Sequence, residues 1–374
     1  MKVAVLHDYL NQFGGAERVL KAILEIFPDA DVYTLLYDKE KTEGLFEGKI
    51  AGTSFLDYDW VRKNHRAFIP VMPFAAGLMK GKDDYDLVIS STAGYAKGIP
   101  VRGSYHISYC HSPLRYAWEI DYLKNLSVSP GLMSKDALRP VAEWLKRWDK
   151  KSSKKVNFFI ANSRFIAEKI RAYYERDAEV VYPPVNTDKF YFEENAERGD
   201  FYLMVGRLLY YKGFDIGIRA FNGMKKKLVI VGRGPEEKKL REMANPTYVR
   251  FVSRVTDNEL RGYYNAAKAF IFPQIEDFGL VAAEAQSCGL PVVSFFRGGG
   301  GEIVADGKTG IHFHEQTPDS LVQAVHAFEN KRFSRRDISK YAARFSEKRF
   351  KEEFVQAIKK SGFLNGWQGP NFPR

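Results

Sequence analysis

The sequence predicts an α/β protein with two doubly wound, Rossmann-like domains. Short apolar runs typical of buried strands alternate with amphipathic helical stretches, a pattern that favours parallel sheets covered by helices. The pattern is interrupted at 182–190, where two prolines stiffen a connection, and then begins again. We therefore expect one domain over residues 1–185 and a second over 186–352, followed by a helix and tail over 353–374.

The individual elements follow from local patterns. In the first half, the expected strands are 2–7, 86–90, 106–110 and 157–163. The helix after the first strand has six apolar residues on one face at helical spacing: Ala16, Val19, Leu20, Ile23, Leu24 and Phe27. In the second half, the expected strands are 201–206, 228–232, 249–253, 269–273 and 291–295. The stretch "FSEKRFKEEFVQAIKK" near the C-terminus reads as an amphipathic helix.

Composition restricts the classes of function. A net charge of +11 favours anionic partners, either nucleic acid, anionic lipid or a phosphorylated substrate, without selecting among them. Only Cys110 and Cys288 occur, so neither a disulfide framework nor a Cys-rich metal site is supported. The chain opens on a strand, and no apolar run approaches the roughly 20 residues of a membrane-spanning helix. We expect a cytoplasmic protein.

Candidate binding residues follow the predicted strands. Ligands of doubly wound sheets bind beyond the carboxyl ends of strands, near helix N-termini. Gly15 in "FGGAER" and Gly232 in "VGRGPE" lie in such turns and either let a ligand approach the backbone or simply form turns. Arg207 and Lys212 in "VGRLLYYKG" either clamp a diphosphate or form a solvated basic loop.

Two carboxylates in "FIFPQIEDFGLVAAEAQSCGLPVVSF" indicate the chemistry of the ligand. Glu276 lies in an expected loop and Glu284 in the helix that begins near Phe278. Eight helical residues span about 12 Å. The carboxylates of glycoside hydrolases are closer, under about 10 Å apart. The spacing therefore favours two carboxylates that hold different parts of one elongated ligand with hydroxyl groups, such as a sugar.

These motifs together resemble a known family. "EDFGLVAAE", "CGLPVV" and "GGGGEIVADGKTG" (298–310) are similar to the signature of the family 4 retaining glycosyltransferases of the GT-B fold. "VGRLLYYKG", "VGRGPE" and "SRVTDNELRGYYNAAKAFIFP" occur in the expected order, and the resemblance covers nearly the whole chain. It implies two domains that face a central cleft and a C-terminal helix that crosses back to the first domain.

The resemblance also implies roles in the second domain. Glu276 would contact hydroxyls of the transferred sugar near the reacting carbon, and Glu284 would accept hydrogen bonds from the nucleoside ribose. Arg207 and Lys212 would neutralise the leaving diphosphate. Three backbone amides would assist them, those of Phe278, Gly279 and Leu280. The Gly232 turn would belong to the nucleotide site, and Val255 would lie near the base.

In the first domain, the resemblance implies that Gly15 approaches the phosphates. His111, in "SYCHSPLRYAWE", would contact the donor sugar, whereas a lone histidine is more often structural. His7 also ends a strand, and we expect it to be structural.

The peptide around His111 and "GGAERV" look most like the branch that builds O-antigen and related surface polysaccharides. This implies GDP-mannose as donor and a lipid-linked saccharide as acceptor. No nucleophile for double displacement is identifiable, so front-face attack is expected, without a required metal. A UDP-sugar donor remains an alternative, as does a non-enzymatic basic binding protein or inactive transferase subunit. The family's donor-site residue types are all present in this sequence, which argues against a nucleic-acid partner.

Two stretches are candidates for contact with a membrane. The segment 138–156 has Trp144 and Trp148 among basic residues, namely Lys146, Arg147, Lys150, Lys151, Lys154 and Lys155. It either lies on an anionic membrane or packs its tryptophans in the core. The apolar, proline-broken segment 68–79 is either a lipid-facing loop or core. We expect a peripheral protein on the inner face of the cell membrane. The tail at 362–374 has no pattern that we can interpret.

Overall fold

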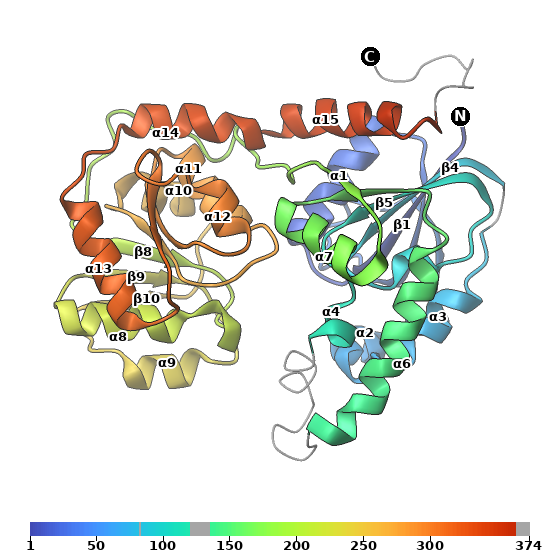
Figure 1. Cartoon of the computed structure of the whole chain (residues 1–374), viewed down its shortest axis with the longest axis horizontal. Helices are drawn as coiled ribbons and strands as arrows, with labels where there is room; N and C mark the ends of the chain where they lie inside the picture. Colours follow the sequence, from blue (N-terminus) through green and yellow to red (C-terminus); the bar gives the residue numbers. More distant parts are fainter. Residues whose placement is uncertain (82–83, 120–134, 364–374) are drawn as a thin grey trace. The chain divides into compact units, whose positions relative to one another are not determined.

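The computed structural model describes residues 1–81, 84–119 and 135–363. The chain forms two compact units, shown in Figure 1. Unit 1 contains Met1–Tyr182 together with the chain from Lys351, and unit 2 contains Pro183–Phe350. Among the described residues, no helix is both long and apolar enough to cross a membrane.

Unit 1 is built on a seven-stranded parallel sheet with the order β3-β2-β1-β4-β5-β6-β7. Its strands are β1 (Val3–Leu10), β2 (Asp31–Tyr37), β3 (Ile50–Thr53), β4 (Tyr85–Thr92), β5 (Gly103–Cys110), β6 (Phe158–Ala161) and β7 (Ala178–Val180). The helices are α1 (Gly15–Ile26), α2 (Asp59–Asn64), η1 (His65–Phe68), α3 (Met72–Leu78), η2 (Ala96–Gly98), α4 (Arg115–Trp118), α6 (Lys135–Ser153), α7 (Arg164–Tyr174) and α15 (Glu347–Lys360).

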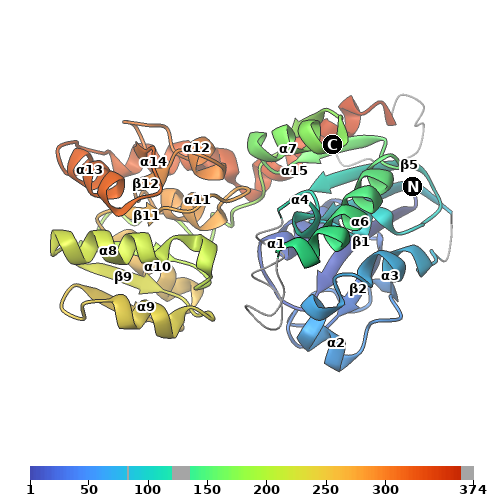
Figure 2. The ribbon, with the colours of Figure 1, turned by 60° about the horizontal axis from the view of Figure 1, so that its bottom comes forward.

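Unit 2 is built on a six-stranded parallel sheet with the order β10-β9-β8-β11-β12-β13. Its strands are β8 (Tyr202–Val205), β9 (Leu228–Val231), β10 (Val249–Val252), β11 (Phe270–Phe272), β12 (Val292–Phe295) and β13 (Gly310–Phe313). The helices are η3 (Tyr210–Lys212), α8 (Phe214–Met224), α9 (Glu237–Met243), α10 (Asp257–Ala266), α11 (Leu280–Ser287), α12 (Gly299–Ile303), α13 (Pro318–Glu329), α14 (Arg335–Ala342) and η4 (Ala343–Phe345). Figures 1 and 2 show helices on both faces of each sheet, as in doubly wound folds.

The strand order reverses once in each sheet, and this reversal positions the candidate site. In unit 1 the chain turns from β1 to β2 on one side and later to β4 on the other, and in unit 2 β8 has the same relation to β9 and β11. Ligands of open parallel sheets bind at this switch point, beyond the carboxyl ends of the strands. The loops after β1, β4, β8 and β11 are therefore where a ligand site is expected.

The predicted fold class is confirmed, and so is the buried face of α1. Four strands were not predicted, namely β2, β3, β7 and β13. The segment 68–79 is not a loop, because it contains α3. That helix buries Met72, Ala75 and Ala76 while Phe74 and Leu78 on its other face are exposed.

Candidate functional site

The turns after β8 and β9 pack backbone against backbone. Gly206 donates its amide hydrogen to the Val231 carbonyl at 3.0 Å, and Gly232 donates to the Val252 carbonyl at 2.9 Å. Gly232 has φ +151°, and a Cβ atom there would lie 1.9 Å from the Gly206 carbonyl oxygen. Glycine is therefore required at 232 for the two turns to meet, and this contact fixes the backbone just before Arg207.

These turns border a cavity of about 580 Å³. It brings together three residues predicted from the sequence, Arg207, Gly232 and Val255. The remaining lining residues are Val205, Gly206, Val231, Arg233, Ser253, Arg254, Thr256, Glu259 and Leu260. Small-molecule sites of about 300–1,000 Å³ with apolar walls and a few polar groups are common, so this cavity has the size and lining to hold a nucleoside.

Two cations that line this cavity, Arg233 and Arg254, were not predicted from the sequence. Arg233 lies two residues after the end of β9, and Arg254 lies two residues after the end of β10. Arg207 has the same position relative to β8 and was predicted for that reason. The signal was therefore present in "VGRG" and "FVSR". Three arginines and an adjacent helix N-terminus, that of α10, make the surroundings of the cavity favourable for an anion.

The N-terminus of α10 is closed by a capping box at the cavity wall. Thr256 donates to Glu259 through its amide at 2.7 Å and its hydroxyl at 2.9 Å, and the Thr256 hydroxyl accepts from the Glu259 amide. The hydrogen bonds from Thr256 lower the pKa of Glu259, so this carboxylate is ionised at neutral pH. The cavity therefore has one fixed acceptor among its basic groups.

The loop after β11 holds Glu276 next to Lys212. The Lys212 ammonium and the Glu276 carboxylate form an ion pair, and each side chain is 17% exposed. The Gly299 amide donates to the Glu276 carbonyl at 2.8 Å. A Cβ atom at Gly298 (φ +72°) would lie 2.5 Å from that carbonyl oxygen. The glycine tract 298–301 thus supports the backbone of the Glu276 loop.

The helix after this loop begins later than the sequence suggested. Gly279 is the N-cap of α11 with φ +104°, and the first helical residue is Leu280 rather than Phe278. A Cβ atom at Gly279 would lie 2.6 Å from the Phe272 ring, so only glycine allows this turn. The Ala282 amide donates to the Gly279 carbonyl at 2.9 Å, and amides at the start of a helix generally suit an anion.

Glu284 lies in the interior of α11 and is buried. It accepts a hydrogen bond from the Tyr264 hydroxyl at 3.4 Å. Burial, reinforced by Glu284, raises the pKa of the neighbouring Cys288 thiol, which stays protonated. Glu284 does not line the cavity described above, so its predicted contact with a ribose stays a prediction.

In unit 1, the predicted residues lie near the carboxyl ends of β1 and β5. Gly15 begins α1, with Gly14 as its N-cap. His111 follows β5, and its Nε2 lies 2.8 Å from the Ser91 hydroxyl. Burial, reinforced by His7, lowers the pKa of His111 to about 3, so the ring is neutral at physiological pH.

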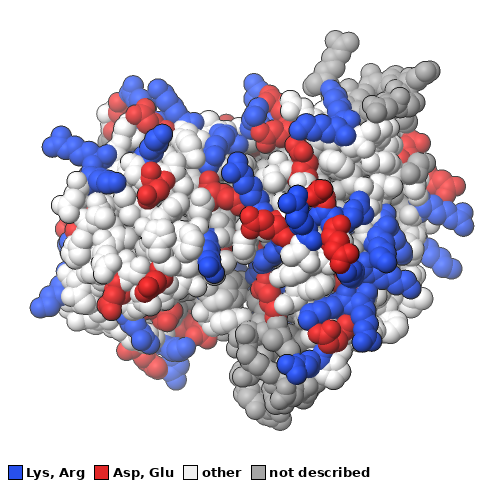
Figure 3. All heavy atoms as spheres, viewed as in Figure 1, with Lys and Arg blue, Asp and Glu red and all other residues white. Residues whose placement is uncertain are grey.

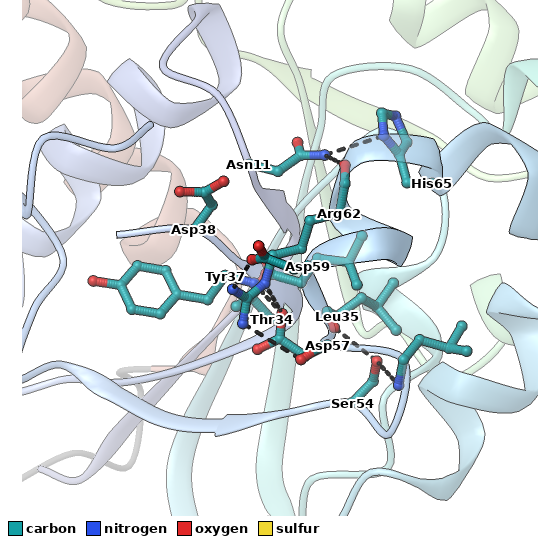
Figure 4. Close-up of polar contacts among 12 residues, drawn as sticks. Asn11, Thr34, Leu35, Tyr37, Asp38, Ser54, Asp57, Asp59, Arg62 and His65 are labelled. Atoms are coloured by element: carbon teal, nitrogen blue, oxygen red, sulfur yellow. Dashed lines mark hydrogen bonds and ion pairs between the residues drawn. The ribbon is translucent and has the colours of Figure 1, made fainter. Parts of the chain in front are cut away.

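A cluster of polar side chains that was not predicted from the sequence lies where β1 and β2 end (Figure 4). The Asn11 amide donates to the Arg62 carbonyl at 3.2 Å and lies 3.1 Å from the His65 ring. Asp57 accepts from the Tyr37 amide at 2.9 Å and from Arg62 Nε at 2.7 Å. These contacts tie α2 and η1 to the carboxyl edge of the sheet.

Both tryptophans of the 138–156 segment contact the core of unit 1. Trp148 lies 5.7 Å from the buried Tyr95 ring, and Trp144 stacks on Phe74 at 5.6 Å. Part of the segment is also exposed, including Arg147 and Lys151. Lys and Arg side chains gather over α6 on the face shown in Figure 3. The segment therefore combines core packing with a basic outer face.

Comparisons with known proteins agree with this architecture. Residues 13–189 match the family model described as Glycosyltransferase Family 4, and residues 186–345 match the model of Glycosyl transferases group 1. An uncharacterized glycosyltransferase of Methanocaldococcus jannaschii is 26% identical over 251 residues, 66% of this chain and 69% of that relative.

Two further similarities are more distant or more local. A GDP-mannose-dependent alpha-(1-6)-phosphatidylinositol monomannoside mannosyltransferase of Mycolicibacterium smegmatis is 34% identical over 170 residues, 38% of this chain and 44% of that relative. The matched region thus spans less than half the length of this relative. The structure of sucrose-phosphate synthase from Thermosynechococcus elongatus has a TM-score of 0.73 at 17% identity, over 96% of this chain and 99% of that chain. The two glycosyltransferase models together match residues 13–345 and both units have the GT-B architecture, so the chain is a glycosyltransferase of the GT-B type.

Proposed function

We propose that the protein transfers a sugar, with retention of configuration, from a nucleoside diphosphate donor to a saccharide acceptor. The observation that supports this most is the cavity beyond the carboxyl ends of β8, β9 and β10 in unit 2, where Arg207 lines a space of nucleoside size. Lys212 and Glu276, on the loops after β8 and β11, supply a cation for a diphosphate and an acceptor for sugar hydroxyls.

The proposed mechanism is front-face attack. The bond from the donor sugar to the diphosphate breaks while the acceptor hydroxyl approaches the same face, and the departing diphosphate takes the acceptor's proton. Arg207, Lys212 and the first amides of α11 stabilise the charge that develops on the leaving group. Glu276 and the neutral His111 hold the sugar, and the remaining catalysis is positioning.

We propose GDP-mannose as the donor and a lipid-linked saccharide in surface-polysaccharide synthesis as the acceptor. Mannose is supported by the GDP-mannose-dependent mannosyltransferase of Mycolicibacterium smegmatis to which the chain is similar, and by the resemblance of the His111 peptide. The alternative is a UDP-sugar with the same site. Purified protein would be incubated with labelled GDP-mannose or UDP-sugars and polyprenyl-linked acceptors, with and without a chelator.

The expected result is transfer of mannose that persists in the chelator and is lost in Arg207→Ala. Transfer from a UDP-sugar alone would replace the proposed donor. Absence of transfer and of donor hydrolysis with every donor would contradict the proposed activity.

We also propose that unit 1 docks on an anionic membrane through the outer side of α2 and α3. We call this the apolar face, and its exposed residues are Phe55, Tyr58, Trp60, Val71, Phe74 and Leu78. Trp60 is 66% exposed and Phe74 59% exposed, which is unusual for large apolar side chains. A groove of about 670 Å³ near its end is lined by Leu78, by the cations Lys80 and Arg102 and by one carboxylate, Asp84, and the two cations could bind a lipid phosphate.

Sedimentation with vesicles tests this docking. Wild type should bind vesicles of phosphatidylcholine with phosphatidylglycerol more tightly than vesicles of phosphatidylcholine alone. Phe74→Ser with Leu78→Ser should reduce this binding, because apolar side chains would no longer enter the interface. Leu45→Ser, which changes an exposed leucine outside the apolar face, is the control. Equal binding of the double variant and the control would contradict the proposal.

A further inference from the structure

A chain of polar groups, buried at His7, Glu17 and Ser91 and half-buried at His111, connects His111 to the glycine turn before α1. His111 Nε2 lies 2.8 Å from the Ser91 hydroxyl, which lies 3.3 Å from His7 Nδ1. His7 Nε2 lies 3.8 Å from Glu17 Oε1. The other oxygen of Glu17 accepts a hydrogen bond from the Gly14 amide at 2.7 Å.

Removing these polar side chains from water costs free energy. The exposed fractions are 2% for His7, 3% for Glu17 and 0% for Ser91. Polar groups removed from water destabilise a fold unless each finds a partner, and a core in this place could be apolar. The register of the sheet builds the contact, since His7 of β1 lies opposite Ser91 of β4. The arrangement therefore calls for a reason beyond packing.

The direction of the hydrogen bonds follows from the chemistry of each group. The negative charge of Glu17 favours a proton on the nearer His7 nitrogen, Nε2, although the 3.8 Å separation is longer than a hydrogen bond. His7 Nδ1 is then an acceptor, and the single hydroxyl hydrogen of Ser91 is donated to it. The Ser91 oxygen in turn accepts from His111, which must carry its proton on Nε2. The Nδ1 atom of His111 is then left as a hydrogen-bond acceptor.

We propose that Glu17, His7 and Ser91 are positioning residues that hold His111 in the Nε2–H tautomer, so that Nδ1 accepts a hydroxyl of the donor sugar. The inference rests on the proposed function insofar as His111 contacts the sugar. Because Glu17 also binds the Gly14 amide, the same chain connects the orientation of His111 to the turn expected to approach the phosphates. The neutral state of His111 at physiological pH is consistent with this role.

The neighbouring residue offers a matched control. Ser90 is also fully buried, and its hydroxyl lies 2.9 Å from His106 Nε2. Successive residues of a strand point to opposite faces of the sheet, so Ser90→Ala removes an equivalent contact on the other face. Ser91→Ala and Ser90→Ala should therefore cost similar stability, and only the first should disturb His111.

The tautomer of His111 can be read without any activity. In two-bond proton–nitrogen correlation spectra of labelled protein at neutral pH, wild type and Ser90→Ala should show the Nε2–H form. Ser91→Ala and Glu17→Gln should move His111 toward a mixture of tautomers. An Nδ1–H form in wild type, or a Ser91→Ala spectrum identical to that of wild type, would overturn the proposal even if the protein transfers sugar.

The kinetic arm separates positioning from folding. Ser91→Ala should lower kcat/KM for the sugar donor about tenfold, the worth of one hydrogen bond, while the affinity for the free nucleotide stays unchanged. Ser91→Thr, which keeps a hydroxyl, should recover part of the rate. Equal kinetics of Ser91→Ala and Ser90→Ala would overturn the positioning role. Failure of nucleotide binding in wild type would instead contradict the proposed function, leaving the tautomer result to decide this inference.

Discussion

At the residue scale, Lys212 on the loop after β8 and Glu276 on the loop after β11 form an ion pair. Each side chain is only partly exposed, so the ammonium is held close to where a diphosphate would lie in the proposed complex. A fixed cation in a partly dry site stabilises developing negative charge more than a solvated one does. The contribution of Lys212 is thus expected in turnover rather than in stability.

Lys212→Ala should lower kcat by about 10²–10³-fold, the usual effect of removing one charge-stabilising group. The free energy of unfolding should change by about 1 kcal/mol or less, because the pair is not deeply buried. Lys226→Ala, which removes the pair with Glu329 at 2.8 Å in the same unit, is the control and should keep the wild-type rate. A Lys212→Ala variant with the wild-type kcat would contradict the proposal that Lys212 binds the diphosphate.

Glu284→Gln should weaken nucleotide binding, if this carboxylate accepts from the ribose as the resemblance implies. Tyr264→Phe deletes the hydroxyl that donates to Glu284 within the protein and should leave nucleotide affinity in place. Calorimetry of both variants measures the difference. Unchanged affinity in Glu284→Gln would show that the ribose assignment is wrong.

The sequence predicted residues that follow strands more readily than residues that meet across the sheet. Arg207 and Glu276 were found because parallel strands present their carboxyl ends to one edge. Arg233 and Arg254 obey the same rule and were overlooked. The contact between His7 and Ser91 could not be predicted from one sequence, because it depends on the register of β1 against β4, two strands that are far apart along the chain.

At the scale of elements, a buried ion pair joins η2 to α6. The ammonium of Lys97 binds Asp149, and both side chains are almost fully buried. Asp149 also accepts from Trp118 Nε1 at 2.8 Å and from the Tyr174 hydroxyl at 2.7 Å. One carboxylate therefore connects α4, α6, α7 and η2, which explains why α6 is anchored to unit 1 despite its many charges.

Asp149→Ala should destabilise the protein by about 3–5 kcal/mol, because it leaves a buried ammonium without its partner. The double substitution Lys97→Met with Asp149→Leu should be less damaging, since no charge remains buried. Lys150→Ala affects the adjacent residue, whose pair with Glu175 is exposed, and should change stability by about 0.5 kcal/mol or less. Urea unfolding measures all three, and similar losses in Asp149→Ala and Lys150→Ala would contradict this account.

Most buried strands were predicted, but β2 and β13 are largely buried and were missed. The face of α1 and the strands β8, β9, β11 and β12 follow from the sequence, because their apolar residues are deeply buried, whereas β10 was predicted although only Val249 in it is buried. β3 and β7 are the outermost strands of their sheet, and most of their residues are only half-buried, so the apolar signal is weak. In α3, Pro73 suggested a break, yet it lies in the first turn, where proline is tolerated.

At the scale of the whole molecule, two histidines are expected to make stability depend on pH. Burial is the main cause that lowers the pKa of His111 to about 3 and that of His106 to about 4. Unfolded histidine titrates near about 6.5. The unfolded chain therefore takes up these protons first as the pH falls. The stability that these two histidines influence is complete above about pH 6.5 and is lost from there down to about pH 4 for His106 and about pH 3 for His111.

The free energy of unfolding should thus fall between pH 7.5 and pH 5, with each histidine adding up to about 1.4 kcal/mol per pH unit. His106→Gln should flatten this dependence. His326→Gln, at an exposed position on α13, should not change it. Denaturant unfolding at several pH values measures the slopes, and an unchanged slope in His106→Gln would show that this ring takes no part.

The central claim is that unit 2 binds the nucleotide of a sugar donor, and a calorimetric titration of the purified protein tests it most directly. GDP and UDP would each be added with a chelator and then with Mg²⁺, to wild type and to Arg207→Ala. We expect GDP to bind wild type without metal and more tightly than UDP. Arg207→Ala should lose most of this affinity. Binding of neither nucleotide, under either condition, would contradict the central claim.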